Sequence, residues 1–225
     1  MFVRTVSLAF AVSVCFVHHQ LYAQVVDIRL ATTTLDGSPV DAVNIGDQFL
    51  LQVFTQQIGG FSGAEEDGGV FAAYLDIDYD ASLATPVGEI EHAELYSGAP
   101  SGVLSSPGLM DDIGGFSSSN GAIGGVNPTG PDERFVFQVK MQARAAGEML
   151  FAAMESGNYP LFDVLVFGVN ERINPNDIQF GSATLSITAV PEPGSAFLLG
   201  FAMTVCAIGW KRALPSQACA AERLS

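Results

Sequence analysis

Hydrophobic and polar residues alternate with a period of two along several stretches between residues 24 and 189. In the ranges 26–32, 135–144 and 182–188, one set of alternate positions is mainly apolar and the other polar. Such alternation predicts β-strands with one face in a core and the other in water. Residues 49–55 and 163–169 are apolar on both faces, which predicts strands nearer the centre of a sheet.

Segments rich in Gly, Pro, Asp and Ser separate these strands, and no useful length of helical periodicity lies between them. The predicted fold is all-β: an antiparallel β-sandwich, with a closed barrel as the second choice. Residues 97–132 are rich in Gly, Ser and Pro and predict a long connection. Residues 113–117 within it could form one more strand.

Residues 69–83 carry another alternating stretch with an acidic face. One face holds Phe71, Ala73, Leu75, Ile77 and Tyr79, and the other holds Ala72, Tyr74, Asp76, Asp78 and Asp80. Successive carboxylates on that face are about 6.6–7 Å apart, so the three aspartates could share a hard cation such as Ca²⁺.

An EF-hand is excluded, because Ala81 and Val87 occupy the positions where that loop needs Gly and Glu. The other interpretation of the acidic face is solvated charge that discourages edge pairing, with Asp80 capping the turn that follows. No other cofactor is predicted.

Three segments together resemble the cohesin-like jelly-roll domains. Residues 43–47 (VNIGD) precede GGVFAAYLDIDYDASL, and residues 135–142 are followed by Ala145-Ala146-Gly147 and Phe151. The resemblance implies a β-sandwich over residues 24–189 that binds on a sheet face, as cohesins bind dockerin modules and assemble extracellular complexes. It does not specify the partner, which could be an envelope protein or an exopolysaccharide.

The predicted domain is strongly acidic and lacks cysteine. The whole chain has a net charge of −15, and residues 24–189 contain 22 acidic against five basic residues. Such a surface repels phosphate backbones, so nucleic acid is excluded as a partner. The three cysteines, Cys15, Cys206 and Cys219, all lie outside this range, which excludes disulfides and thiolate metal sites within it.

The N-terminus has the pattern of a signal peptide. Arg4 precedes an apolar run over residues 5–17 and a more polar segment that ends at Ala23. We expect residues 1–23 to direct export through the cell's export machinery, with cleavage after Ala23. An uncleaved anchor is the alternative, although the run is short for spanning a membrane.

Near the C-terminus a rigid turn, an apolar run and a basic stop follow one another. Residues 194–210 carry no charge and would extend about 26 Å as a helix, at the short end of what crosses a bilayer. Trp210, Lys211 and Arg212 supply the aromatic anchor and the positive flank expected at the cytoplasmic side. The alternative is a buried core helix.

This segment resembles the PEP-CTERM sorting signal of bacterial envelope proteins. The residues that carry the resemblance are Val190, Pro191, Glu192, Pro193, Lys211 and Arg212. The resemblance implies a transmembrane helix within residues 190–212 and processing by exosortase, a membrane-embedded cysteine transpeptidase. Residues 213–225 would form a short cytoplasmic tail, longer than such signals usually have. The domain would then lie outside the cytoplasm, first membrane-anchored and later at the cell surface or in the extracellular matrix.

No catalytic constellation is predicted. His92 is the one histidine between residues 24 and 189, and Glu89 and Glu91 stand beside it. Two hypotheses follow: a non-enzymatic adhesion or assembly module of the envelope, or an envelope polysaccharide hydrolase that uses surface carboxylates such as Glu89 and Glu91.

Overall fold

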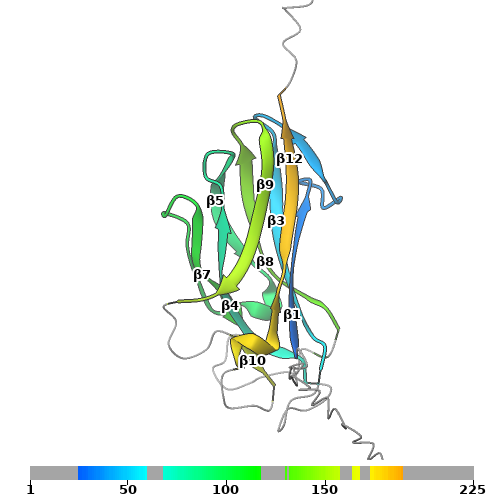
Figure 1. Ribbon diagram of the computed structural model, residues 1–225. Helices are drawn as coiled ribbons and strands as arrows, with labels where there is room; N and C mark the ends of the chain where they lie inside the picture. Colours follow the sequence, from blue (N-terminus) through cyan, green and yellow to red (C-terminus); the bar gives the residue numbers. More distant parts are fainter. Residues whose placement is uncertain are drawn as a thin grey trace, which may run out of the picture.

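Two β-sheets face each other in the computed structural model, with a hydrophobic core between them. The structure describes residues 25–59, 68–117, 130, 132–157, 164–167 and 173–189. Figure 1 shows the strands running along the long axis of the molecule, with β9 and β12 of one sheet in front of β3 and β8 of the other. The predicted β-sandwich is confirmed. The described residues contain no α-helix, only two short 3₁₀ helices, η1 (Glu94–Tyr96) and η2 (Pro175–Asp177).

The strands divide unequally between the sheets. The smaller sheet has the order β11 (Ile178–Phe180), β1 (Val26–Thr33), β3 (Gln48–Gln57), β8 (Arg134–Ala143) and β5 (Ala84–His92). The larger sheet has the order β2 (Ala42–Asn44), β12 (Ser182–Thr188), β9 (Gly147–Glu155), β4 (Val70–Tyr79), β7 (Leu109–Phe116) and β6 (Gly98–Val103). A further strand, β10 (Val164–Val166), pairs with β4.

The sequence predicted an antiparallel sandwich, but two of the strand pairings are parallel. β11 runs parallel to β1, and β2 runs parallel to β12. Alternation of apolar and polar residues is the same in both kinds of pairing, so the pattern could not distinguish them.

The chain passes from one sheet to the other at Gly181, which is the single residue between β11 and β12. Its N–H donates to the carbonyl of Ile28 at 2.8 Å, and its own carbonyl accepts from the N–H of Ala153 at 3.0 Å. A Cβ at this position would lie 2.4 Å from the Ile28 oxygen. Glycine therefore lets the backbone bridge both sheets and close this side of the sandwich.

Most of the predicted strands have the predicted core face. In β1, Val26, Ile28 and Leu30 are buried, and in β12 Leu185 and Ile187 are buried. β3 is the middle strand of the smaller sheet, as its apolar character had predicted. The side chains from β1 and β3 of the smaller sheet and from β12 of the larger sheet share one core cluster, and burial of apolar area is the main stabilising contribution.

A bulge in β8 overturns the predicted position of Phe135. Val53 pairs with Phe137, but the next residue, Phe54, pairs with Phe135, so Val136 is an extra residue in β8. Val136 and Phe137 are both buried in the core, and Phe135 turns to the outer face. A bulge reverses the alternation from that point onward, which a strict period of two cannot anticipate.

A second irregularity displaces Phe71. The pairing of β4 with β10 shifts between Leu165 and Val166, and Phe71 is half-buried outside the main core, where its ring lies 5.7 Å from that of Phe116. The strand predicted over residues 163–169 is confirmed in its burial, since Val164, Leu165 and Val166 are all buried, but it ends at Val166. Its described part is the three-residue β10, which pairs with β4 at one end of the larger sheet.

The predicted long connection over residues 97–132 contains two strands, β6 and β7. The one suggested strand, 113–117, is the second half of β7. The glycines of β7 made this segment look like a loop, but the structure requires one of them. A Cβ at Gly114 would lie 1.9 Å from the carbonyl oxygen of Ala73 on β4. The residue that weakened the strand prediction is the one that allows β7 to approach β4.

The predicted signal peptide (1–23), sorting signal with its helix (190–212) and tail (213–225) lie outside the described residues. In the part of the chain that the structure describes, no helix has the length and hydropathy needed to cross a membrane.

Candidate functional site

The outer face of the larger sheet carries the most unusual group of side chains, and it is centred on β4. Strand alternation directs Tyr74, Asp76 and Asp78 away from the main core. Tyr74 belongs to a small second cluster with Ala72 and Leu165, and its hydroxyl donates to the carbonyl of Ala99 at 2.9 Å. This cluster fixes one end of the face.

Asp76 is buried although it lies on the outer face, with 7% of its surface exposed. One carboxylate oxygen accepts the backbone N–H of Asp112 at 2.8 Å. The pairing of β4 with β7 is irregular here, because Leu75 pairs with Ile113 while Ile77 pairs with Met110. Asp111 and Asp112 of β7 both lie opposite the single residue Asp76 of β4, so a bulge with one extra residue places two acids against it.

These three aspartates form an acidic cluster. Their carboxylate oxygens lie within 4.8 Å of one another. Asp112 has a φ of 52°, a left-handed conformation that Asp tolerates better than most residues, and its carboxylate accepts the hydroxyl of the buried Ser156. Among the described residues this is the one group of three acids, histidines or cysteines close enough to hold a metal ion.

Burial raises the pKa of the Asp76 carboxyl above its ordinary value. Backbone N–H groups of Asp112 and Gly157 oppose this shift by donating to the carboxylate, and the negative charges of Asp111 and Asp112 add to it. The charged form of Asp76 is therefore held in an unfavourable position, which a cation or a basic side chain from outside would relieve.

The predicted set of three aspartates is divided by the structure. Asp76 is brought to Asp111 and Asp112, whereas Asp78 is exposed on β4. Asp80 follows the strand, and its carboxylate accepts the N–H of Ser82 at 2.8 Å and the hydroxyl of Ser82 at 2.6 Å, which lowers the pKa of Asp80. The prediction that Asp80 caps the turn is confirmed.

The sequence pattern did not connect Asp111 and Asp112 with Asp76. The contact joins residues 36 positions apart in the sequence, through a strand that looked like a loop. Two consecutive acids directly before Ile113-Gly114-Gly115 were the available signal. A bulge places consecutive side chains on one side, which regular alternation would not do.

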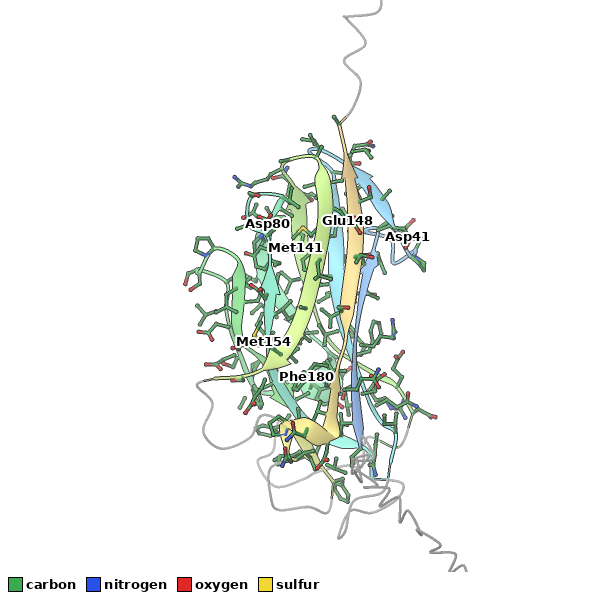
Figure 2. The ribbon with its side chains drawn as sticks, in the orientation of Figure 1. Asp41, Asp80, Met141, Glu148, Met154 and Phe180 are labelled. Atoms are coloured by element: carbon green, nitrogen blue, oxygen red, sulfur yellow. The ribbon has the colours of Figure 1, made fainter. Side chains whose placement is uncertain are left out.

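Two exposed apolar side chains lie on the outer face of β9, and one of them, Met154, lies beside the acidic cluster. Leu150 is 52% exposed and Met154 is 38% exposed. They are four residues apart on one strand and therefore on one face, and Met154 pairs directly with Asp76 of β4. Figure 2 shows Met154 near one end of β9 and Glu148 near the other.

The strands of the larger sheet contain acids but no Lys or Arg. The basic residues of the described part of the chain all lie on or next to the smaller sheet, and they are Arg29, Arg134, Lys140 and Arg144. The face around β4 and β9 therefore combines exposed apolar side chains with negative charge that no Lys or Arg of its own strands offsets. We call it the acidic face; it consists of Asp76, Asp78, Asp111, Asp112, Leu150 and Met154.

The carboxylates considered for hydrolysis lie elsewhere, on β5 at the edge of the smaller sheet. Glu89 and Glu91 are exposed, and Glu91 accepts the side-chain N–H of Gln138 at 2.7 Å. His92 is half-buried with its ring 6.1 Å from that of Phe137, and burial lowers its pKa. The structure thus gives Glu91 a partner in a hydrogen-bonded row and does not join His92 to either glutamate.

The sequence matches no protein-family model and no curated protein. Among solved structures, its neighbours include cohesin domains. A chain of the complex between a CaDoc0917 variant and CaCohA2 is 17% identical with a TM-score of 0.46, over 73% of this chain and 99% of that chain. A chain of the complex between the third cohesin of ScaC and the ScaB dockerin, from Acetivibrio cellulolyticus, is 8% identical with a TM-score of 0.46, over 73% and 99%.

A type II cohesin domain from the cellulosome of the same organism is 12% identical with a TM-score of 0.41, over 72% of this chain and 95% of that chain. Identities and TM-scores this low assign neither a family nor a partner to the protein.

Proposed function

We propose that this protein is an exported component of the bacterial envelope or extracellular matrix, and that its β-sandwich is a non-enzymatic module that binds a protein partner. The acidic face is the observation that carries the binding function. It presents the exposed Met154 beside three clustered carboxylates, and the exposed Leu150 on the same face about 13 Å further along β9. Exposed apolar residues within a charged surface are typical of interaction sites.

Charge defines the partner of the acidic face. Its strands contain no Lys or Arg, so a surface with basic side chains around an apolar centre would complement it. A basic group near Asp76 would also stabilise the charged form of that carboxylate, whose pKa burial raises. Two copies of the acidic face would repel each other, so the partner is a different surface.

Export and retention are proposed from the two ends of the sequence. Residues 1–23 would pass through the export machinery, and residues 190–212 would hold the protein in the membrane until an exosortase-like enzyme processes it. β12 ends at Thr188, directly before this segment, and Figure 1 shows that end at one tip of the sandwich.

Paired substitutions on the acidic face test the binding function. Leu150→Glu with Met154→Glu should reduce capture of the envelope partner at least tenfold, because these changes remove the apolar centre and add charge within it. The measurement is quantitative pull-down from envelope fractions. Leu35→Glu with Ile58→Glu is the matched control, because these residues are similarly exposed (53% and 46%) away from this sheet. Equal loss in both pairs, or loss in neither, would contradict the proposal.

Replacement of Pro191, Glu192 and Pro193 by alanine tests retention separately. We expect the variant to be exported but not transferred to its final location, because the turn before the apolar run is altered. Fractionation of cells and immunodetection of the domain provide the measurement. An unchanged distribution between membrane, surface and medium would rule out the sorting role and leave the binding function intact.

A further inference from the structure

The outer face of the smaller sheet differs from the rest of this acidic protein at its centre. β3 and β8 are adjacent, and neither contains an Asp or Glu, although residues 24–189 contain 22 acidic residues. Their outward positions carry instead several glutamines, two phenylalanines, Leu50 and Lys140, and β8 begins with Arg134. Amides offer both donors and acceptors without charge.

The bulge in β8 creates an aromatic pair on this face. Regular alternation would have placed Phe135 in the core, but the extra residue Val136 turns it outward beside Phe54. The two rings lie 5.7 Å apart with an interplanar angle of 56°. The guanidinium of Arg29 lies 4.2 Å from the centre of the Phe54 ring, and Glu133 accepts from it at 2.5 and 2.8 Å. Bulges next to functional sites often redirect side chains in this way.

A row of hydrogen-bonded side chains crosses three strands next to this pair. The Nε2 of Gln52 on β3 donates to Oε1 of Gln138 on β8 at 3.0 Å, and Nε2 of Gln138 donates to Oε2 of Glu91 on β5 at 2.7 Å. Each amide is thereby held in one orientation, with its second N–H not used within the row. Polar groups fixed before binding lose less entropy when a ligand arrives.

We propose that this amide strip, formed by Gln52, Gln138, Glu91, Phe54 and Phe135, binds an uncharged polysaccharide strand. Amide and carboxylate groups can bond to sugar hydroxyls, and the phenylalanine rings can pack against the apolar C–H faces of sugar rings. Neighbouring strands are about 4.8 Å apart, a spacing similar to the advance of one sugar in an extended chain. The polysaccharide would cross the strands, one sugar on each.

The charge of the protein favours an uncharged polysaccharide over an anionic one. The net charge of −15 repels a polyanion such as a uronate polymer, and Glu91 at the end of the row adds local repulsion. The strip presents amides and aromatic rings, and the Arg29 guanidinium beside it is paired with Glu133, so it matches a ligand without charge. This site is separate from the acidic face, because it lies on the other sheet.

Binding of the full chain to defined polysaccharides tests the proposal. The full chain, purified in mild detergent, is mixed with insoluble cellulose or chitin, or run in native gels that contain soluble mixed-linkage β-glucan, with alginate as the anionic comparison. We expect binding to at least one neutral polymer and none to alginate. Binding to none of the neutral polymers, or preferential binding to alginate, would overturn the proposal.

The double variant Gln52→Ala with Gln138→Ala should weaken that binding at least tenfold, because it removes both fixed amides. Phe54→Ala should weaken it as well, which provides a second variant if the first unfolds; circular dichroism establishes folding. Gln142→Ala is the control, since Gln142 lies on β8 outside the row and bonds to Gly46. Leu150→Glu with Met154→Glu should bind the polysaccharide like wild type. Equal binding by wild type, the double variant and Phe54→Ala would refute the site.

Discussion

The outer faces of the two sheets share one backbone device but differ in chemistry. On the larger sheet, a bulge in β7 places Asp111 and Asp112 against the buried Asp76, on strands that contain no Lys or Arg. On the smaller sheet, a bulge in β8 places Phe135 beside Phe54, next to a row of amides. One bulge thus concentrates negative charge, and the other places an aromatic pair beside a row of amides.

The comparison shows where binding chemistry can be introduced into a sandwich without changing its core. Apart from the bulges, the buried faces of both sheets follow regular alternation, and they pack as one cluster. The bulges in β8 and β7 change which side chains reach the outer faces but do not open the core cluster. Val136 and Ile113, which lie at these bulges, remain fully buried. Local departures from regular pairing therefore serve the outer faces.

The largest expected effect concerns the close approach that supports the acidic face. Gly114→Ala should destabilise the protein by about 3 kcal/mol or more, because the added Cβ would lie 1.9 Å from the backbone oxygen of Ala73. Urea denaturation of both proteins measures the difference. Gly157→Ala is the control, because no atom lies within 4 Å of its added Cβ. A Gly114→Ala variant as stable as the control would show that β7 does not pack on β4 in this register.

A smaller effect of opposite sign is expected at Asp76. Asp76→Asn should raise the melting temperature by about 2–4 °C at pH 7, because it replaces a buried carboxylate near two other acids and keeps the acceptor for the Asp112 N–H. Because the pKa of Asp76 is raised in the folded state, its carboxyl does not destabilise wild type below the ordinary value of 3.8. Wild type loses stability as the pH rises through the folded-state pKa and Asp76 becomes charged.

The gain from Asp76→Asn should therefore vanish at low pH. Thermal melts at several pH values, in buffer with a chelator, follow the difference. Asp78→Asn is the matched control on the same strand, since Asp78 is exposed. A gain that persists below pH 3.8, or equal gains from both substitutions, would disagree with a buried charge at Asp76.

The smallest effect concerns the ion pair beside the amide strip. Glu133→Gln should reduce stability by a few tenths of a kcal/mol at pH 7, because Arg29 and Glu133 are both partly exposed and such pairs contribute little. The hydrogen bond from Arg29 lowers the pKa of Glu133, so the contribution is present above pH 4.5 and is lost as the pH falls through the folded-state pKa.

Chemical denaturation at pH 7 and at pH 3 measures this contribution. Asp132→Asn is the control, because Asp132 is 82% exposed and its oxygen is 3.7 Å from Arg134. An effect of Glu133→Gln that is larger than about 1 kcal/mol would mean that the pair holds the strip together more strongly than its exposure indicates.

The buried faces could be predicted from the sequence because they depend on local alternation. Val26, Ile28, Leu185 and Ile187 lie where the period of two puts them. Phe135 does not, because one inserted residue reverses the phase, and nothing in the local pattern marks Val136 as that insertion.

The acidic cluster could not be predicted because it depends on pairing between distant segments. Asp76 and Asp112 meet only after β7 pairs with β4, and the glycines of β7 have low strand propensity. The steric reason for Gly114 appears only when its neighbour Ala73 is known. The same limit applies to the parallel strands β2 and β11, whose partners are far away in the sequence.

Site-specific photocrosslinking in the native envelope tests the central claim most directly. A photoreactive residue at position 154 lies on the acidic face, and one at position 142 lies on the outer face of the smaller sheet. If the β-sandwich binds a protein through the acidic face, position 154 should give one discrete protein adduct that position 142 does not. Identical adducts at both positions, or none at position 154, would contradict the account.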